Sequence, residues 1–574
     1  MKKYQVAATL LALCPAAVMG QSSRSIAVWN AGEPSYFSIN ATDSLKYESD
    51  ETLAVYSGGV RESFDTRNID SVTVVSPAVT NTNSRSDDEL AAEFSSLTFS
   101  STAYKKVGNG NPLMGHKFGA DPFAMVDGDR VYIYMTDDHL YKDNGEVIKE
   151  GYGDTRRISI ISSEDLVNWS DHGAQPVAGS GAPASWANNS WAPCAAHKTI
   201  DGKEKYFLYF ADNGSGIGVL TADTPYGPWK LPKSGMKQLI SRSTPNCGDV
   251  TWLFDPAVLV DDDGKAYLYF GGGVPDGKDS DPGTARCVQL GDDMISIVGT
   301  PQKINPPYLF EDSGINKVGG KYLYSYCSNW TGNSNPGVAK IAYMTSDSPL
   351  GPFRYVGAIF DNPGDAGWAG GGGNNHHAMF EFQGKYYMTY HTRALKSAMR
   401  KDWPDIADGA ELRSACLSEM KVDTVKGTVT KLNASQTSIT GVAQIRNFNP
   451  YANVPGATMA WERDITTSYD NVGNKFSKKM SCPAHAKAGS WMCLSNVDFK
   501  NGAVGLTLKA KGKGVIKFCN GTSKYNKAFA LVEVQDDGNY KTYTVPVSNM
   551  PIGVSKKLYI LFSGDISLES WSFF

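Results

Sequence analysis

Five segments of this 574-residue chain repeat one local pattern. In each, an opening residue is followed by a turn that contains Gly or Asp and then by a strand-like run: VYIYM, KYFLYF, AYLYF, KYLYSY or KYYMTY. The opening residues are Asp121, Trp191, Asp255, Glu311 and His377. Runs spaced by roughly 55 to 75 residues suit one four-stranded blade plus its loops, and such a unit needs neighbours to bury its faces.

The composition of residues 109–447 predicts antiparallel β-structure throughout. Aromatic residues alternate with aliphatic ones, Asp and Gly mark turns, and few stretches have helical periodicity. If the five units close radially they form a five-bladed β-propeller, and their opening residues converge on one axis. Three carboxylates, a Trp and a His would then meet in one site. The alternative for this region is a β-sandwich with fortuitously regular spacing.

The regions on either side have different patterns. Residues 448–574 are strand-rich with their own apolar alternation, which predicts a separately folded β-sandwich of the jelly-roll type. Residues 21–108 are rich in Ser, Thr, Asn and Asp; they form either a small β module or a loosely ordered extension. The expected fold class is therefore all-β, a five-bladed β-propeller followed by a β-sandwich.

Residues 1–20 have the features of a cleavable secretory signal: two lysines, an apolar run and a region of small residues. We therefore expect a secreted protein whose mature chain begins near Gln21. A lipoprotein signal at Cys14 would need a smaller preceding residue than Leu13. No later stretch reaches the roughly 20 apolar residues that span a bilayer.

Net charge limits the kinds of partner that the chain can bind, and the cysteine content limits its disulfides and metal sites. A net charge of -4 gives no support for a nucleic-acid or membrane partner, so we expect a neutral ligand and a monomeric protein. Apart from Cys14 there are eight cysteines, five before residue 420 and three after residue 480. The odd count in each part means either a free thiol in each or a bridge between them. No Cys/His spacing is typical of zinc.

Three of the five opening residues are acids. Asp121 and Asp255 directly precede proline, which favours an extended backbone at both, and Glu311 lies in LFEDSG. Carboxyl groups in apolar surroundings with like-charged neighbours have pKa values that are pushed apart. Glycoside hydrolysis by inversion needs one protonated and one ionised carboxyl about 6.5–9.5 Å apart. Three acids on a propeller axis suit this chemistry.

Other residues of the repeat region could contact a ligand. Trp191, Trp252 and Trp330 could stack on a sugar or belong to the core. Arg413 could orient a substrate or a carboxylate, or form a surface ion pair.

Four glycines and two asparagines precede His376 and His377, which indicates a tight turn or a close approach by a ligand. Strand alternation predicts that one histidine points inward. The inward one could be a metal ligand, a water-mediated hydrogen-bonding partner or a core residue.

The motifs NPLMGHKFGADPF, SWAP, WLFDPAVLVDDDGKAYLYFGGG, PPYLFEDSG, YSYC and GGGGNNHHAMF resemble glycoside hydrolase family 43, most closely its arabinoxylan arabinofuranohydrolases. The resemblance covers roughly residues 109–447 and implies a five-bladed propeller. It implies that Asp121 is the general base, Glu311 the general acid, and Asp255 the carboxylate that orients the acid and modulates its pKa. The residues that it implies to line the sugar pocket are Trp191, Trp252, Trp330, Asn374 and Arg413. His377 matches an axial histidine associated with calcium.

The C-terminal segment, from NPYANVPGATMAW to the motif around Trp571, resembles carbohydrate-binding module family 6. Pro455-Gly456-Ala457 replaces two carboxylates that commonly hold calcium there, and Ser567 replaces a sugar-contacting Asn. We expect the fold to be retained, with calcium absent and sugar binding weak or lost.

The expected function is that of a secreted inverting α-L-arabinofuranosidase acting on arabinoxylan, without an organic cofactor. Within the same fold the alternatives are a β-xylosidase and an arabinan-cleaving enzyme. The alternative of another class is a non-catalytic polysaccharide-binding protein. The intact acids Asp121, Asp255 and Glu311 argue against it.

Overall fold

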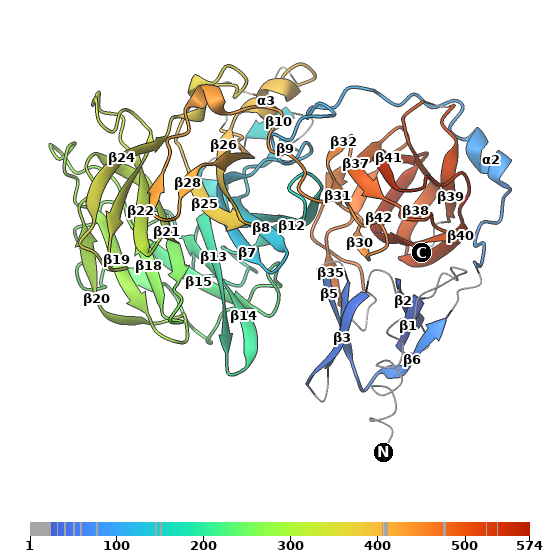
Figure 1. Cartoon of the computed structure of the whole chain (residues 1–574), viewed down its shortest axis with the longest axis horizontal. Coiled ribbons are helices and arrows are strands. Elements are labelled where there is room, and N and C mark those ends of the chain that lie inside the picture. Colours follow the sequence, from blue (N-terminus) through green and yellow to red (C-terminus); the bar gives the residue numbers. More distant parts are fainter. Residues whose placement is uncertain are drawn as a thin grey trace.

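The computed structural model describes residues 25–30, 33–38, 42–49, 52–57, 60–75, 79–143, 146–149, 152–403, 406, 411–473, 478–523, 525–535 and 538–574. The expected signal sequence, residues 1–20, lies outside them. Figure 1 shows a ring of sheets beside a second body that contains the C-terminus, with a smaller set of strands near the N-terminus. Of the described helices, α2 (Asp87–Ala92) and α3 (Ala394–Met399) included, none is long and apolar enough to cross a bilayer.

Five antiparallel sheets follow one another between residues 120 and 420. The first sheet contains β7 (Ala120–Asp127), β8 (Arg130–Thr136), β11 (Arg157–Ser163) and β12 (Trp169–Pro176). The second contains β13 (Trp191–Ile200), β14 (Lys203–Ala211), β15 (Gly216–Ala222) and β16 (Ile240–Ser241). The third contains β17 (Ala257–Val260), β18 (Ala266–Phe270), β19 (Ala285–Leu290) and β20 (Ile297–Ile304). The fourth sheet contains β21 (Leu309–Val318), β22 (Lys321–Ser328), β23 (Ile341–Ser346) and β24 (Arg354–Phe360). The fifth contains β25 (His377–Phe382), β26 (Lys385–Thr392) and β27 (Ser414–Met420).

The first strands of the five sheets close a ring. Contacts run from β7 to β13, β17, β21 and β25 and back to β7. The five-bladed propeller is therefore confirmed, and the sandwich alternative for this region is wrong. The aromatic runs of the repeat are the second strands, and their side chains pack on both faces because each blade lies between two others. Every opening residue lies at or near the start of a first strand.

The C-terminal body is a β-sandwich, as the sequence predicts. One sheet contains β32 (Trp461–Arg463), β37 (Trp491–Asp498), β41 (Val554–Phe562), β38 (Gly505–Cys519) and β39 (Ala528–Val534). The other contains β33 (Thr466–Thr467), β36 (Ala484–Ala486), β42 (Asp565–Phe573), β30 (Val454–Pro455), β40 (Lys541–Pro546) and again the long β38. Between them lies an apolar core that includes Phe518 and Trp571. A short strand, β31 (Thr458–Met459), pairs with β12 and joins the sandwich to the first blade.

Residues 25–75 form two small antiparallel sheets (Figure 1), the first of the two alternatives for this segment. The strands are β1 (Ser25–Asn30), β2 (Glu33–Ser38) and β6 (Ile69–Val75), and β3 (Thr42–Ser49), β4 (Thr52–Ser57) and β5 (Val60–Asp65). Ile26, Val28, Val55 and Phe64 form their shared core.

Residues 79–108, called the strap below, run along the outer face of the β32–β37–β41–β38–β39 sheet. Ser86 caps α2, and the buried side chains of Leu90 and Phe94 pack on Trp491 and Tyr559 of that sheet. The strap and the C-terminal sandwich, which are about 340 residues apart in sequence, therefore share one core. The prediction that the sandwich folds separately does not include this contact.

All eight cysteines of the described residues are buried free thiols. The alternative of a bridge between the two groups of cysteines is therefore wrong. Burial raises the pKa of thiols such as Cys482 and Cys327 well above the usual value, which makes them poor nucleophiles.

The remaining short elements connect or extend these bodies. They are the hairpins β9 (Leu140–Asp143) with β10 (Glu146–Lys149), β28 (Val422–Asp423) with β29 (Thr428–Val429), and β34 (Asp470–Asn471) with β35 (Met480–Ser481), and the 3₁₀ helices η1 (Tyr152–Asp154), η2 (Pro363–Asp365) and η3 (Ala434–Gln436).

Candidate active site

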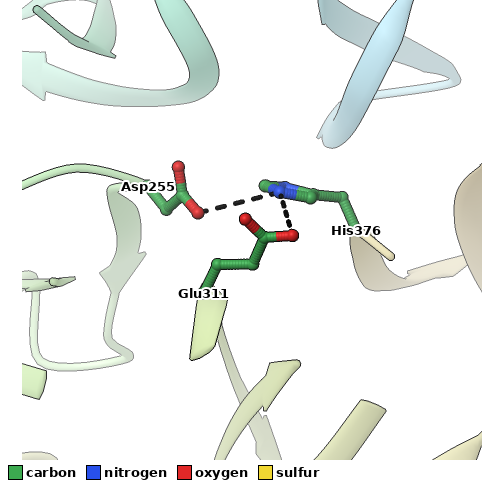
Figure 2. A group of neighbouring side chains, drawn as sticks. All are labelled: Asp255, Glu311 and His376. Atoms are coloured by element: carbon green, nitrogen blue, oxygen red, sulfur yellow. Dashed lines mark ion pairs between the residues drawn. The ribbon is translucent and has the colours of Figure 1, made fainter. Parts of the chain in front are cut away.

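The ring of first strands brings the three predicted acids together around one histidine. His376 Nδ1 lies 3.7 Å from Asp121 Oδ1, while its Nε2 lies 3.7 Å from Asp255 Oδ2 and 3.5 Å from Glu311 Oε1. Figure 2 shows the imidazole facing Asp255 and Glu311, which come from neighbouring first strands. All four side chains are buried. The predicted convergence on the axis therefore occurs for the carboxylates.

Asp121 is surrounded by donors and cations. Its Oδ2 accepts a hydrogen bond from Thr136 Oγ1 at 2.8 Å, and its Oδ1 accepts one from Arg413 Nη1 at 2.7 Å. Burial alone would raise the pKa of this carboxyl, but the charges of Arg413 and His376 and the Thr136 hydroxyl outweigh burial and hold it well below its usual range. Asp121 is therefore ionised at neutral pH.

The backbone at the two Asp-Pro sites is not extended as expected. Asp121 and Asp255 both have φ of 49°, in the left-handed region. Tertiary hydrogen bonds hold this conformation: the Asp121 amide donates to His391 Nδ1 at 3.1 Å, and Asp255 Oδ2 accepts from the Asp312 amide at 2.8 Å. Such residues cluster at functional sites, where the surrounding structure stabilises a costly conformation.

His391 is a neutral ring that fixes the Asp121 backbone. Because its Nδ1 accepts a hydrogen bond, its proton lies on Nε2, which donates to the Asn374 carbonyl at 2.9 Å. Burial and the nearby Arg413 lower the pKa of His391 to about 3, which agrees with an uncharged ring. Asn374 thus reaches the site through its backbone, while its side-chain oxygen accepts no hydrogen bond from the described residues.

Asp255 and Glu311 form a pair of carboxyl groups that share one proton. Burial and the neighbouring Glu311 raise the pKa of Asp255 to about 8, although His376 opposes the shift. Two buried carboxyl groups so close together cannot both ionise cheaply, so the pair keeps one proton near neutral pH. Within the described residues, Glu311 Oε1 accepts no hydrogen bond. That buried oxygen therefore has hydrogen-bonding capacity that no described residue uses.

His376, and not His377, lies among the carboxylates of Asp121, Asp255 and Glu311. Both ring nitrogens of His377 are already engaged, Nδ1 with Asp312 Oδ2 at 2.5 Å and Nε2 with Ser325 Oγ at 2.7 Å. Gly314 permits this packing, since a Cβ at that position would lie 2.4 Å from the Ser325 hydroxyl. His377 is therefore a hydrogen-bonded core residue of the site's floor.

His376 supplies the positive charge at the centre. Burial alone would lower the pKa of His376, but the surrounding carboxylates of Asp121, Asp255, Asp312 and Glu311 raise it well above its usual value. The protonated ring compensates the charge of these acids and keeps Asp121 apart from Glu311, because the two acids face opposite nitrogens of the ring.

Arg413 is buried and links two carboxylates. Besides Asp121, it binds Asp138 through Nε at 2.9 Å and Nη2 at 3.0 Å, and its guanidinium lies 5.6 Å from the centre of the Tyr152 ring. The surface ion pair considered for Arg413 is therefore excluded. This residue orients the carboxylate of Asp121.

The three predicted tryptophans lie at different depths. Trp191 is half-buried and meets Tyr152 edge-on, with 6.1 Å between ring centres. Trp252 packs edge-on against Phe254 and Phe310 at 5.3 Å each, directly beside the Asp255 and Glu311 segments. Trp330 is 49% exposed, so a polymer can reach its ring.

Several residues of the site were missed by the sequence reasoning. They are Thr136, Asp138, Tyr152, Asp312 and His391, and of the two histidines considered the resemblance assigned the axis to His377 instead of His376. A signal existed for two of them, because Thr136 and Asp138 directly follow the first aromatic run and so lie at the same end of the blade as the opening residues.

The groups of the site together provide an ionised base, a retained proton and a cation in one buried cluster. That combination supports acid–base chemistry on a bond placed between Asp121 and Glu311.

Known proteins resemble this chain over most of its length. Residues 110–417 match the model of a family described as glycosyl hydrolases family 43. The chain is 41% identical to the arabinoxylan arabinofuranohydrolase of Paenibacillus polymyxa, covering 82% of this chain and 75% of that protein. It is 44% identical to the arabinoxylan arabinofuranohydrolase of Bacillus subtilis (strain 168), covering 70% and 79%. The crystal structure of a family 43 arabinoxylan arabinofuranohydrolase from B. subtilis in complex with cellotetraose has a TM-score of 0.75 and 39% identity, covering 82% of this chain and 99% of that one.

Proposed function

Because the chain belongs to glycoside hydrolase family 43, we propose that it is an α-L-arabinofuranosidase that removes arabinose side groups from arabinoxylan. Two relatives that are more than 40% identical are named for this activity. The observation that carries the mechanism is the difference in protonation within one site: Asp121 is held ionised, while the Asp255–Glu311 pair retains a proton near neutral pH.

In the proposed mechanism Asp121 is the general base. A water molecule beside its carboxylate transfers a proton to it and attacks the anomeric carbon of arabinose. Arg413 and Thr136 each use one oxygen of the carboxylate, and every carboxylate oxygen keeps a further lone pair for the water. The low pKa of Asp121 ensures that this base is unprotonated at the pH of reaction.

Glu311 is the proposed general acid. Its Oε1 accepts no hydrogen bond from the described residues, and His376 Nε2 at 3.5 Å lies within ion-pair distance of it. A proton on this carboxyl can be passed to the glycosidic oxygen as the bond breaks. Asp255 supports this role, because its raised pKa lets the pair exchange one proton and its Oδ2 is fixed by the Asp312 amide. The leaving sugar then departs as an alcohol.

The separation of the two acids favours inversion. Asp121 and Glu311 lie on opposite sides of His376, at 3.7 Å and 3.5 Å from its two nitrogens. Two carboxyl groups that face different nitrogens of one imidazole are compatible with the roughly 6.5–9.5 Å of inverting enzymes. Water therefore attacks directly, without a covalent sugar intermediate.

Calcium at the axis does not fit the donors of this chain. Asp255, Glu311 and His376 present ligand atoms within 4.8 Å of one another, but calcium prefers six to eight oxygens. Both nitrogens of His377 are engaged with Asp312 and Ser325. We assign no step to a metal.

The substrate is proposed to bind in a pocket with an aromatic rim. Trp191 and Trp252 would pack against the arabinose ring, and Asn374 would donate to a sugar hydroxyl. The half-exposed Trp330 would stack on the xylan main chain.

For the C-terminal sandwich we propose a structural role with weak sugar binding at most. The Ser567 hydroxyl is engaged with His485 Nδ1 at 2.8 Å. Pro455 pairs with Ser570, and the Gly456 amide donates to the Glu569 carbonyl, so this turn extends the sheet and offers no side-chain carboxylate to calcium.

The sugar released from wheat arabinoxylan tests the substrate. We expect arabinose alone. Release of xylose or xylo-oligosaccharides would instead support the β-xylosidase alternative, and release of arabinose from linear arabinan alone would support the arabinan-cleaving one.

Asp121→Asn tests the mechanism. The variant should lose at least about 10²-fold in rate and still fold, because the amide keeps the shape of the carboxyl. Asp261→Asn is a matched control, since Asp261 is equally buried but follows the end of β17 that is remote from Asp255, bonded to Lys317 and Tyr322. Retained activity in the Asp121 variant would refute its role.

Export of the protein is also proposed. The signal-like residues 1–20 should be removed, so the mature N-terminus, determined by sequencing protein from the medium, should lie near Gln21.

A further inference from the structure

Tyr152 has a fixed backbone and a half-exposed side chain whose hydroxyl is hydrogen-bonded to Glu411. It begins the 3₁₀ helix η1, which follows the β9–β10 hairpin inserted after β8. Its carbonyl accepts hydrogen bonds from Trp191 Nε1 at 2.9 Å, Asn189 Nδ2 at 3.1 Å and Thr155 Oγ1 at 3.2 Å. The side chain is nonetheless 48% exposed. An aromatic residue held so firmly and left half open at the rim of a buried site is suited to contact a ligand.

The ring of Tyr152 touches two groups of the site. The guanidinium of Arg413 lies 5.6 Å from its centre, and Trp191 meets it edge-on at 6.1 Å. Arg413 in turn donates to the Asp121 carboxylate. Tyr152 is therefore one contact away from the general base on one side and one contact away from a predicted sugar-binding tryptophan on the other.

We propose that Tyr152 is a substrate-positioning residue: with Trp191 it forms the aromatic wall against which the arabinosyl group packs, and it holds the Arg413 guanidinium against Asp121. This inference rests on the proposed arabinofuranosidase function. The C–H face of a sugar packs well on an exposed aromatic ring, and a cation over such a ring is attracted to its electron-rich face.

The two parts of this role predict different kinetic effects. Loss of the wall weakens substrate binding and raises KM. Loss of the cation–π contact loosens Arg413, so the pKa of Asp121 rises and the acidic limb of the pH profile of kcat/KM moves to higher pH. A merely structural Tyr152 would lower the melting temperature and leave both KM and the acidic limb in place.

The experiment compares Tyr152→Phe, Tyr152→Leu and Tyr152→Ala in the full chain. The wild type is first assayed on arabinoxylan and on nitrophenyl α-L-arabinofuranoside; if neither releases arabinose, the proposed function has failed and Tyr152 is not at issue. With an active wild type, the Leu and Ala variants should lose about 3- to 30-fold in kcat/KM, as expected for the loss of an aromatic contact. Their acidic limb should shift upward. The Phe variant keeps the ring and should stay within about twofold.

Tyr47→Ala provides the control for removing an exposed tyrosine. Tyr47 is 51% exposed and lies in the N-terminal module, far along the chain from the site. It should have wild-type kinetics. Leu and Ala variants of Tyr152 with wild-type KM and an unmoved acidic limb would overturn the proposal, and so would a Phe variant as impaired as Ala. If Ala fails to fold, the bulkier Leu variant decides the question.

Discussion

Arg413 Nη1 donates a hydrogen bond to Asp121 Oδ1 over 2.7 Å, and both side chains are buried. The same guanidinium donates two hydrogen bonds to Asp138, so three hydrogen bonds in total fix its orientation. Guanidinium groups stay charged throughout the pH range of proteins. This contact therefore offsets the burial of Asp121 and keeps the proposed base ionised in the acidic range.

Arg413→Lys should narrow the active pH range from the acidic side. A lysine ammonium is a point charge and cannot bind both carboxylates in the geometry of the guanidinium fork. With weaker compensation the pKa of Asp121 rises, so more of the base is protonated at low pH. We expect kcat/KM to fall about 10- to 100-fold and its acidic limb to move to higher pH. The measurement is a pH profile of arabinose release.

Arg286→Lys is the matched control for this experiment. Arg286 is also 2% exposed, pairs with Asp249 and lies in the third blade away from the axis. It should lose stability without any movement of the acidic limb. An Arg413→Lys enzyme with the wild-type profile would show that Asp121 needs no such partner.

Glu311→Gln should lower kcat much more for a substrate with a poor leaving group than for one with a good leaving group. The amide cannot donate a catalytic proton, so release of arabinose from arabinoxylan, whose leaving group is a sugar alcohol, should fall by about 10³-fold or more. A nitrophenyl arabinofuranoside departs as a stable phenolate and should lose much less. Comparison of kcat on the two substrates gives the result. Equal losses on both would argue that Glu311 is not the general acid. Glu533→Gln, a buried acid of the sandwich, should behave as wild type.

Asp255→Asn should make the protein more stable at neutral pH while lowering its activity. The pKa of Asp255 is about 8 in the folded protein and near 4 when unfolded, so between these values the folded state binds more protons than the unfolded one. Stability of the wild type therefore falls as pH rises from about 4 to about 8. Asparagine removes this cost, on the order of 4 kcal/mol at pH 7, and can still accept from the Asp312 amide.

The measurement is the melting temperature of both proteins as a function of pH. The variant should exceed the wild type at pH 7 to 8, and the difference should disappear near pH 4, where the wild-type carboxyl is protonated in both states. A variant that is less stable at every pH would mean that Asp255 is ionised and paired in the folded protein.

The propeller and its acids follow from the repeat, because equivalent positions of a closed ring must converge. This is why Asp121, Asp255 and Glu311 were found from spacing alone. The choice between the two histidines could not be made this way. β25 begins at His377, so His376 belongs to the glycine-rich loop before it, where strand alternation no longer sets the direction of a side chain.

Contacts between distant segments explain the other differences. The residue before proline is normally extended, but the Asp121 backbone adopts a left-handed conformation that is held by His391, 270 residues later. Tyr152 lies in an insertion specific to one blade, so no repeat points to it. The strap is polar except for a few side chains, and its partner lies about 400 residues away in sequence, beyond the reach of any local pattern.

The strap predicts where the chain can be shortened. Leu90 and Phe94 are buried against Trp491 and Tyr559, and the Trp491 indole donates to the Ser100 carbonyl at 2.8 Å. Without the strap, this face of the sandwich would expose a contiguous apolar patch, which is a frequent cause of aggregation. A chain beginning at residue 79 should therefore be soluble and active, while one beginning at residue 109 should aggregate or lose its sandwich.

Phe94→Ala tests the same contact in the full chain. The ring is 1% exposed and has Lys517 Nζ 5.5 Å from its centre, so truncation should cost about 3 kcal/mol of sandwich stability. Denaturant unfolding with tryptophan fluorescence measures this, and Trp491 in the contact is a local reporter. Val425→Ala, at a side chain that is 90% exposed, should change nothing. If the chain from residue 109 folds with a wild-type unfolding midpoint, the strap is a passive linker, and residues 448–574 form the sandwich by themselves.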